Sequence, residues 1–449
     1  MLPRPYLKTK KMNNGVFDRV LVDSIVDELK ITDLGQATIG QVLLLASRLE
    51  QVTGIPFIRM DQGVPGLEAN RIGVEAEKEA LDRGVAAIYP PAEGIPPLKE
   101  ESSRFIKAFL DIDVAPRSCV PVTGSVSGSF GSFIICNQLD PAKDTVLFLD
   151  PGFPIQKSQL RMLSIKYDTF DVHDYRGEAL RDKLESHLAA GNVSSIIYSN
   201  PNNPAWICFD ETELRIIGEL ATEYGAVVIE DLAYFAMDFR SDLGTPFQPP
   251  YQATVARYTD NYILLLSGSK IFSYAGQRIA VVAMSDKLYD QCYPALAGRY
   301  GGVGQFGPTL VNGVLYMITS GAAHSVEYAL AEMFRAASDG RLDFVEDTKE
   351  YGRRAERMKR LFTDKGFRIV YDKDGERAIG DGFFFTLGYG DMTSAGLMRE
   401  LIYYGISSIT LNTTGSLQQG VRACTSRMTE ELYPVLAERL DAFAADHPL

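Results

Sequence analysis

Residues 263–270 have the sequence Ile263-Leu264-Leu265-Leu266-Ser267-Gly268-Ser269-Lys270, and a second apolar run, 279–282, follows Arg278. Continuous apolar runs are typical of strands buried on both faces of a sheet. Lys270 is therefore expected where a buried strand opens into a crevice. Burial lowers the pKa of a lysine, as a nucleophilic amine requires, whereas an arginine stays charged and can hold a phosphate. The alternative for this stretch alone is an ordinary lysine on a surface loop.

Strands and helices alternate ahead of this stretch. They are expected at 145–149 (strand), 177–190 (helix), 194–198 (strand), 210–224 (helix) and 226–229 (strand). This alternation predicts a mostly parallel α/β sheet, in which ligands gather at the carboxyl ends of the strands. Four chemically distinct residues follow such strand ends and are expected to share one crevice: Phe153, Asn203, Asp231 and Lys270.

The pattern changes after residue 285. Helices are expected at 308–320, 326–337 and 344–365, followed by strands at 367–371, 382–388 and 419–424 and a last helix from 429. We predict a three-layer α/β/α large domain over residues 61–343. Residues 1–60, a leading helical arm, and 344–449 are predicted to form a smaller α+β domain.

Composition narrows the class of protein. The 449 residues are 46% hydrophobic and 23% charged, as in ordinary globular proteins. A net charge of -13 argues against nucleic acid or an anionic membrane as the main partner. The five cysteines lack the spacing of a zinc site, so no metal is expected. Since no apolar run has membrane-spanning length and Met1 to Asn14 have no signal-peptide core, we expect a cytoplasmic protein.

Two glycine-rich segments suggest phosphate binding. The segment 119–128 reads as an extended entry into a helix whose first turn contains only small residues, and free backbone N–H groups at such a helix start suit a phosphate. The alternative is tight packing of this helix on the sheet. The segment Gly302-Val303-Gly304-Gln305-Phe306-Gly307 matches a dinucleotide-binding pattern, but no convincing strand precedes it, so we reject a nicotinamide site.

Taken in order, the motifs resemble the fold type I pyridoxal-phosphate aminotransferases of classes I and II. They are Asn200-Pro201-Asn202-Asn203-Pro204, Asp231 with Tyr234, Ser267-Gly268-Ser269-Lys270, and Arg278. The resemblance extends from about Asp61 to the carboxyl terminus, and the interval from Lys270 to Arg278 is the family's usual one. It implies that pyridoxal 5'-phosphate is the cofactor and that Lys270 forms the Schiff base with it.

The resemblance also implies roles around the cofactor ring. Asp231 matches the carboxylate that keeps the pyridine nitrogen protonated, which the electron sink requires. Tyr234 and Asn203 match residues that bind the phenolic oxygen. Phe153 matches an aromatic that stacks on the ring, although aromatics at strand ends are commonly core residues. The catalytic residues implied are Lys270, Asp231 and Tyr234.

Phosphate and substrate contacts follow from the same resemblance. Ser125, Val126, Ser267 and Arg278 match the phosphate ligands, and Tyr89 matches a tyrosine that reaches the phosphate of the neighbouring subunit, which implies a homodimer with shared active sites.

Arg422 matches the arginine that binds a substrate α-carboxylate in a bidentate fork, and its strand context favours it over Arg427. Gly63 and Val64 match a substrate-contacting segment. Arg299 is a candidate, by rough location only, for the second cation that a dicarboxylic substrate needs.

The chain departs from the family pattern at two places. Trp206, in Asn203-Pro204-Ala205-Trp206, replaces a usual glycine, and residues 411–416 replace the usual approach to the carboxyl-terminal arginine. We expect substrate selectivity to depend on these two regions.

The function expected is transfer of an amino group between an L-amino acid and a 2-oxo acid such as 2-oxoglutarate. A lyase or decarboxylase with the same fold and cofactor is the alternative. A transcription regulator with an aminotransferase-like module would add a basic helix-turn-helix domain, for which the leading arm is short and the chain too acidic.

Overall fold

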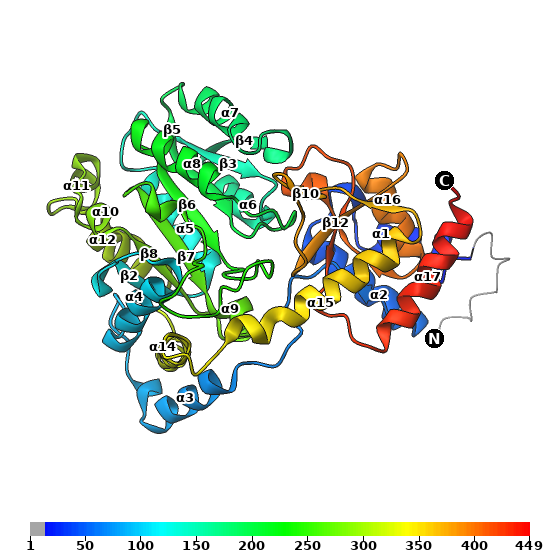
Figure 1. Ribbon diagram of the computed structural model, residues 1–449, viewed down its shortest axis with the longest axis horizontal. Coiled ribbons are helices and arrows are strands. Elements are labelled where there is room, and N and C mark those ends of the chain that lie inside the picture. The colour runs from blue at the N-terminus through cyan, green and yellow to red at the C-terminus, as the bar shows by residue number, and fades with distance from the viewer. Residues whose placement is uncertain (1–13) are drawn as a thin grey trace.

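The computed structural model of the chain describes residues 14–449. The prediction about a signal segment near Met1, and the first 13 residues of the predicted small domain, lie outside this range. Two lobes of unequal size lie side by side, and helix α15 (Phe344–Thr363) runs from the larger lobe to the smaller one (Figure 1).

A seven-stranded sheet forms the centre of the large lobe. Its strands lie in the order β2 (Cys119–Val122), β8 (Ala280–Met284), β7 (Tyr262–Ser267), β6 (Val227–Leu232), β5 (Val193–Ser199), β3 (Thr145–Asp150), β4 (Lys166–Asp171). Strand β8 is antiparallel to both of its neighbours, and the other neighbouring pairs are parallel. The prediction of a mostly parallel sheet is confirmed.

The residues of β7 show why this sheet is the middle layer of three. All six are buried, and the five apolar ones, residues 262–266, alternate between two hydrophobic cores. Leu264 and Leu266 pack in the core that contains Phe105 of α4 (Pro96–Leu110), whereas Ile263 and Leu265 pack in the core with Phe133 of α5 (Ser125–Cys136). A strand places successive side chains on opposite faces, so an unbroken apolar run requires helices on both.

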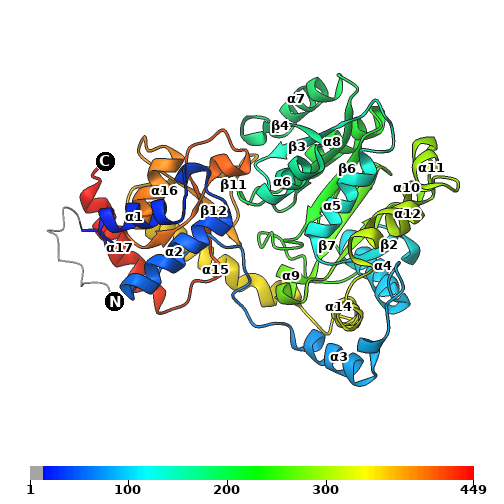
Figure 2. The same ribbon diagram turned by 180° about the vertical axis from the view of Figure 1, so that it is seen from behind.

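The remaining helices of the large lobe cover these faces and its lower edge (Figure 2). They are α3 (Arg71–Asp82), α6 (Pro154–Leu163), α7 (Ala179–Leu188), α8 (Glu211–Glu223), α9 (Gly268–Ile271), α10 (Asp286–Asp290), α11 (Pro294–Tyr300), α12 (Phe306–Thr309), the π-helical turn η7 (Leu310–Leu315), α13 (Tyr316–Thr319) and α14 (His324–Ser338). The glycine-rich segment at 302–307 follows helix α11 rather than a strand, so it lacks the preceding strand that a dinucleotide-binding site needs.

Strand β4 and helix α6 were not expected from the sequence. The first four residues of β4 are exposed at the edge of the sheet, so the strand lacks the apolar run that marks its neighbours. Helix α6 begins directly after Phe153, and two of its residues, Ile155 and Gln156, line the cavity described below.

The small lobe contains a four-stranded antiparallel sheet. Its strands lie in the order β14 (Ile409–Thr410), β15 (Val421–Cys424), β12 (Phe384–Tyr389), β9 (Phe367–Ile369). The other elements of this lobe are α1 (Arg19–Glu28), α2 (Ile39–Thr53), α16 (Ser394–Tyr403), α17 (Leu432–Asp446), the pair β1 (Ile58–Arg59) and β13 (Ile406–Ser407), and the hairpin of β10 (Lys373–Asp374) with β11 (Arg377–Ala378).

Short 3-10 turns join several of these elements. They are η1 (Leu34–Gln36), η2 (Val85–Ala87), η3 (Pro116–Ser118), η4 (Val172–Asp174), η5 (Val255–Arg257), η6 (Ala275–Gln277) and η8 (Leu411–Thr414).

The predicted domain boundaries at 61 and 344 stay a proposal, which the distribution of the cores supports. One core consists of residues between Phe17 and Met60 and between Met358 and Phe443. Helix α15 joins both lobes, because Phe344 and Tyr351 pack in the large lobe's core while Met358 packs in the small lobe's.

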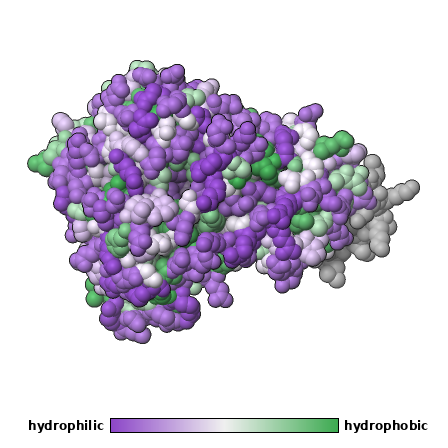
Figure 3. Space-filling model, viewed as in Figure 1, coloured by the Kyte–Doolittle hydropathy of each residue, from purple (hydrophilic) through white to green (hydrophobic). Residues whose placement is uncertain are grey.

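Figure 3 shows the polarity of one face of the molecule. The face in Figure 3 is largely hydrophilic, with apolar residues in small groups. Within residues 14–449, no helix is both long and apolar enough to cross a membrane.

Candidate active site

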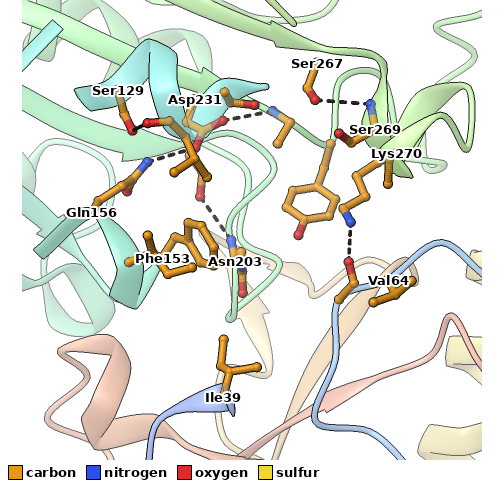
Figure 4. A pocket seen from close by; sticks show the side chains of 18 of the residues that line it. Ile39, Val64, Ser129, Phe153, Gln156, Asn203, Asp231, Ser267, Ser269 and Lys270 are labelled. Atoms are coloured by element: carbon orange, nitrogen blue, oxygen red, sulfur yellow. Dashed lines mark hydrogen bonds between the residues drawn. The ribbon is translucent and has the colours of Figure 1, made fainter. Parts of the chain in front are cut away.

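A cavity of about 330 Å³ lies at the carboxyl ends of the large lobe's strands, where the small lobe faces them. Twelve of the predicted site residues line it: Gly63, Val64, Ser125, Val126, Phe153, Asn203, Asp231, Tyr234, Ser267, Lys270, Arg278 and Arg422. Figure 4 shows that the labelled members of this group point toward one another from different elements. The structure therefore brings together residues that lie up to 359 positions apart in the chain, as Gly63 and Arg422 do.

Lys270 lies on α9, the short helix that begins where β7 ends. Its ammonium donates a hydrogen bond to the backbone carbonyl of Gly63 (Figure 4). Burial lowers the pKa of Lys270 from 10.5 to about 8, and the positive charges of Arg278 and Arg422 act in the same direction. A substantial share of this amine is therefore neutral, and so nucleophilic, near physiological pH.

Asp231, near the end of β6, is only 6% exposed. Its carboxylate accepts hydrogen bonds from the Gln156 side chain at 2.9 Å and from the Ala233 amide at 3.2 Å. Burial raises the pKa of Asp231 to about 6, because these two bonds only partly offset the loss of water. A cationic partner such as a protonated pyridine nitrogen would restore the carboxylate's ordinary acidity.

Arg422, on β15, is a buried cation with 1% of its surface exposed. Its guanidinium donates to the Asn203 side-chain oxygen at 3.2 Å and to the Asp61 carbonyl, and its Nε has no partner among the described residues. The Asp61 carboxylate is occupied by Arg59, at 2.9 Å. Arg422 makes no ion pair with any residue in 14–449, and burial lowers its pKa. Because an unpaired buried charge is costly, this side of the cavity favours an anion.

Tyr234, which lines the cavity, packs against two other aromatic side chains. Trp206 contacts it edge to face, with ring centroids 5.6 Å apart, and Phe384 does so at 5.3 Å. Trp206 has a φ of 64°, so this tryptophan takes the left-handed conformation at the position where the resemblance has glycine. Its indole is buried and does not line the cavity, so Trp206 acts on the site through Tyr234 and Phe384 rather than by touching a ligand.

The remaining end of the cavity is suited to a phosphate. Helix α5 begins at Ser125 without a side-chain cap, and the Arg278 guanidinium lies against Gly124, the residue just before this helix. A Cβ added at Gly124 would lie 2.3 Å from the Arg278 Nη2 atom, so the glycine makes room for the guanidinium. Ser267 lines the same end, and its oxygen accepts a bond from the Ser269 amide at 3.1 Å. Free helix N–H groups beside an arginine are a typical phosphate site.

Three other candidates lie outside this cavity. Tyr89 is 89% exposed and lies away from the cavity lining of its own chain. Arg427 is exposed and contacts the Gln62 side chain at 3.4 Å, while Arg422 lines the cavity, which supports the preference for Arg422. Arg299, on α11, does not line the cavity of its own chain. Its approximate position in the sequence was therefore not enough to predict a substrate contact.

Several lining residues were missed from the sequence. They are Ile39, Gln62, Ser129, Ile155, Gln156, Ser199, Ala233, Ser269 and Ala275. Gln156 and Ile155 lie on α6, whose existence was itself not expected. An unassigned segment after Phe153 that begins with proline was the available signal, because proline is favoured in the first turn of a helix.

Comparison with known proteins agrees with this geometry. The family model "Aminotransferase class I and II" matches residues 57–440, and the chain belongs to this family. Pyridoxal 5'-phosphate is the cofactor of the family. The cradle at Gly124, the buried carboxylate of Asp231 and the desolvated amine of Lys270 fit its phosphate, its ring nitrogen and its aldehyde.

Individual members of the family share only low sequence identity with this chain. The chain is 27% identical over 231 residues to a probable aspartate aminotransferase of Methanocaldococcus jannaschii, covering 51% of this chain and 58% of that protein. It is 24% identical over 272 residues to an aspartate aminotransferase of Pyrococcus horikoshii, covering 60% and 65%. The matched segments thus span less than two thirds of these relatives. The solved aspartate aminotransferase of Thermus thermophilus with maleate has the same fold, with 17% identity, a TM-score of 0.71, and coverage of 93% of this chain and 98% of that chain.

Proposed function

We propose that this protein is an aminotransferase that moves an amino group between an L-amino acid and a 2-oxo acid such as 2-oxoglutarate. The observation that carries the proposal is the buried cation of Arg422, which has no ion-pair partner among residues 14–449, in the same cavity as the desolvated amine of Lys270. An amino acid presents a carboxylate and an amine on one carbon, which matches this pair of groups.

Five of the lining residues have defined tasks in this proposal. Lys270 would hold the cofactor through its aldehyde, and once the substrate's amine has displaced it, the freed Lys270 amine would move a proton to and from the substrate α-carbon. Asp231 holds a proton at the ring nitrogen, and Gln156 orients its carboxylate. The chemistry that pyridoxal phosphate supplies when bound is withdrawal of electrons from that α-carbon. Arg422 binds the α-carboxylate, and Asn203, bonded to Arg422, orients the guanidinium.

Single-substrate reactions test the proposed reaction. The holoprotein mixed with one amino acid at a time should form the pyridoxamine form of the cofactor and one equivalent of the matching 2-oxo acid. Adding 2-oxoglutarate should then restore the starting spectrum. Release of ammonia with pyruvate, or of carbon dioxide, would instead identify the lyase or decarboxylase of the same fold and contradict transamination.

A homodimer with shared active sites is also part of the proposal. Tyr89 is fully displayed to solvent, and Ile88, Tyr316 and Met317 are exposed apolar side chains. These segments lie close together, because His324, directly after the loop that follows α13, contacts the Ile88 carbonyl at 3.0 Å. Large apolar side chains grouped on a surface are typical of protein contacts.

Sedimentation equilibrium should give twice the chain mass. A monomer that is fully active would contradict shared active sites.

We also propose a cytoplasmic location. All five cysteines are free thiols, which suits a reducing compartment. Recovery of the protein in the periplasmic or membrane fraction of its cell would overturn this.

A further inference from the structure

A second cavity adjoins the active-site cavity and shares two wall residues with it, Ile39 and Ile155. It has a volume of about 560 Å³ and lies between the start of α2, helix α6 and the turn at 412–415. In Figure 4, Ile39 lies on the small-lobe side of the active-site cavity, across from Asp231 and Lys270. The two cavities thus adjoin at apolar side chains, on the side of the active-site cavity that faces a molecule held by Lys270 and Arg422.

The charges of the second cavity are of one sign. Its described lining includes Lys157 and Arg161 but neither aspartate nor glutamate, although the whole chain has a net charge of -13. Lys157 is paired with the buried carboxylate of Asp150. Arg161 donates only to the Ser158 hydroxyl, at 2.8 Å, and forms no ion pair with any residue in 14–449. Arg161 is therefore the lining cation that is available to an anionic group.

Helix α6 connects the two cavities. Ile155, Ser158 and Arg161 follow one another at intervals of three residues, so they lie along one side of the helix. At 1.5 Å per residue, Arg161 lies about 9 Å farther along the helix axis than Ile155. The remaining lining is uncharged, with hydroxyl and amide groups from Thr38, Asn412 and Thr413 beside apolar residues such as Ala37 and Pro154. The lining is thus apolar where the two cavities adjoin, at Ile39 and Ile155, and cationic at Arg161.

We propose that the second cavity is the side-chain subsite of the substrate, and that the substrate is an amino acid whose side chain is longer than that of glutamate and ends in a carboxylate or similar anion. Arg161 binds that terminal anion and is a specificity-determining residue. The inference rests on the proposed function, because it assigns the substrate of the same site. It also accounts for the unusual sequence at 411–416, since this segment forms one wall of the subsite.

Matched pairs of ligands test the proposal. With the holoenzyme, 2-aminopimelate should be a better amino donor than 2-aminoheptanoate, which has the same chain length without the terminal carboxylate. Arg161→Gln should lower kcat/KM for 2-aminopimelate by about tenfold or more, the size expected for a lost charge-assisted hydrogen bond. The same variant should leave kcat/KM for 2-aminoheptanoate within about twofold of its original value. Lys373→Gln removes an exposed cation that lines neither cavity and is the control for net charge.

Binding without turnover separates this inference from the proposed function. Calorimetry with pimelate and heptanoate should show a preference for pimelate that Arg161→Gln removes and Lys373→Gln preserves. If the holoenzyme binds pimelate in this way but converts no amino acid, the subsite stands and the proposed reaction is wrong. If it transaminates amino acids but shows no preference for the terminal carboxylate, or if Arg161→Gln affects both ligands equally, the subsite is wrong. Arg161 is exposed, so the variant should fold, and its melting temperature verifies this.

Discussion

Replacing Lys270 by alanine should remove covalent attachment of pyridoxal phosphate and lower the rate of transamination by about 10²–10⁴-fold or more, the contribution of a positioned acid–base group alone. The reason is geometric, because Lys270 carries the only amine that lines the active-site cavity within the described residues. Borohydride reduction followed by mass spectrometry of the peptides measures the attachment directly. In the wild type, the added mass should be on Lys270.

Lys373→Ala is the control for this experiment, since that lysine is exposed and outside the cavity. The pH dependence provides a second check. The neutral amine is the reactive form, and a pKa near 8 means that its fraction rises through pH 8 and levels off above it. Attachment of cofactor to the wild-type apoprotein should therefore stop accelerating well below pH 10.5. A Lys270→Ala protein that still carries the label, or a rate that climbs steadily to pH 10.5, would refute the assignment.

Replacing Arg422 by glutamine should lower kcat/KM for α-amino acids by at least about 30-fold, since breaking a buried hydrogen-bonded charge pair costs about 2–5 kcal/mol. Most of this change should be in KM, because the carboxylate is bound in the ground state as well as in the transition state. Without substrate, the same variant should be as stable as the wild type or more so, since it removes a buried charge that has no ion-pair partner among residues 14–449.

The opposite signs of these two effects make the Arg422 test specific. A primary amine that lacks the carboxylate should react equally slowly with the wild type and Arg422→Gln. Arg427→Gln should change KM far less, because Arg427 is exposed at the surface. If Arg427→Gln had the larger effect, or if Arg422→Gln were unfolded at ordinary temperature, the guanidinium would be structural and the carboxylate would bind elsewhere.

Much of the large lobe was predictable for a physical reason. Its strands are buried on both faces, so each is an unbroken apolar run, and residues after parallel strands meet at one edge of the sheet. Asn203 follows β5, Asp231 lies near the end of β6, and Lys270 follows β7. These three strands are neighbours in the sheet. Their convergence therefore follows from topology. Strand β4 and helix α6 lacked such a signal, and with them Gln156 and Arg161 were missed.

The Trp206 substitution illustrates a limit of motif reasoning. The sequence indicates that a glycine is replaced, and we expected the indole to influence selectivity. In the structure the indole packs behind Tyr234 and Phe384 and does not reach the cavity. A side chain's direction depends on backbone conformation and on neighbours distant in the chain, neither of which a local motif contains.

The stretch at 263–270 by itself determined that a buried strand ends shortly before Lys270, because apolar periodicity is a local property of the chain. What only the tertiary structure decided is the environment of that lysine. Gly63, just past the predicted domain boundary at 61, and Arg422, from the small lobe, lie close to it. Arg278 and Arg422 help burial to lower its pKa, and Ile39 and Ile155 line both its cavity and the one that contains Arg161. Charge pairing and cavity shape depend on contacts between distant segments, and those exist only once the two lobes have packed together.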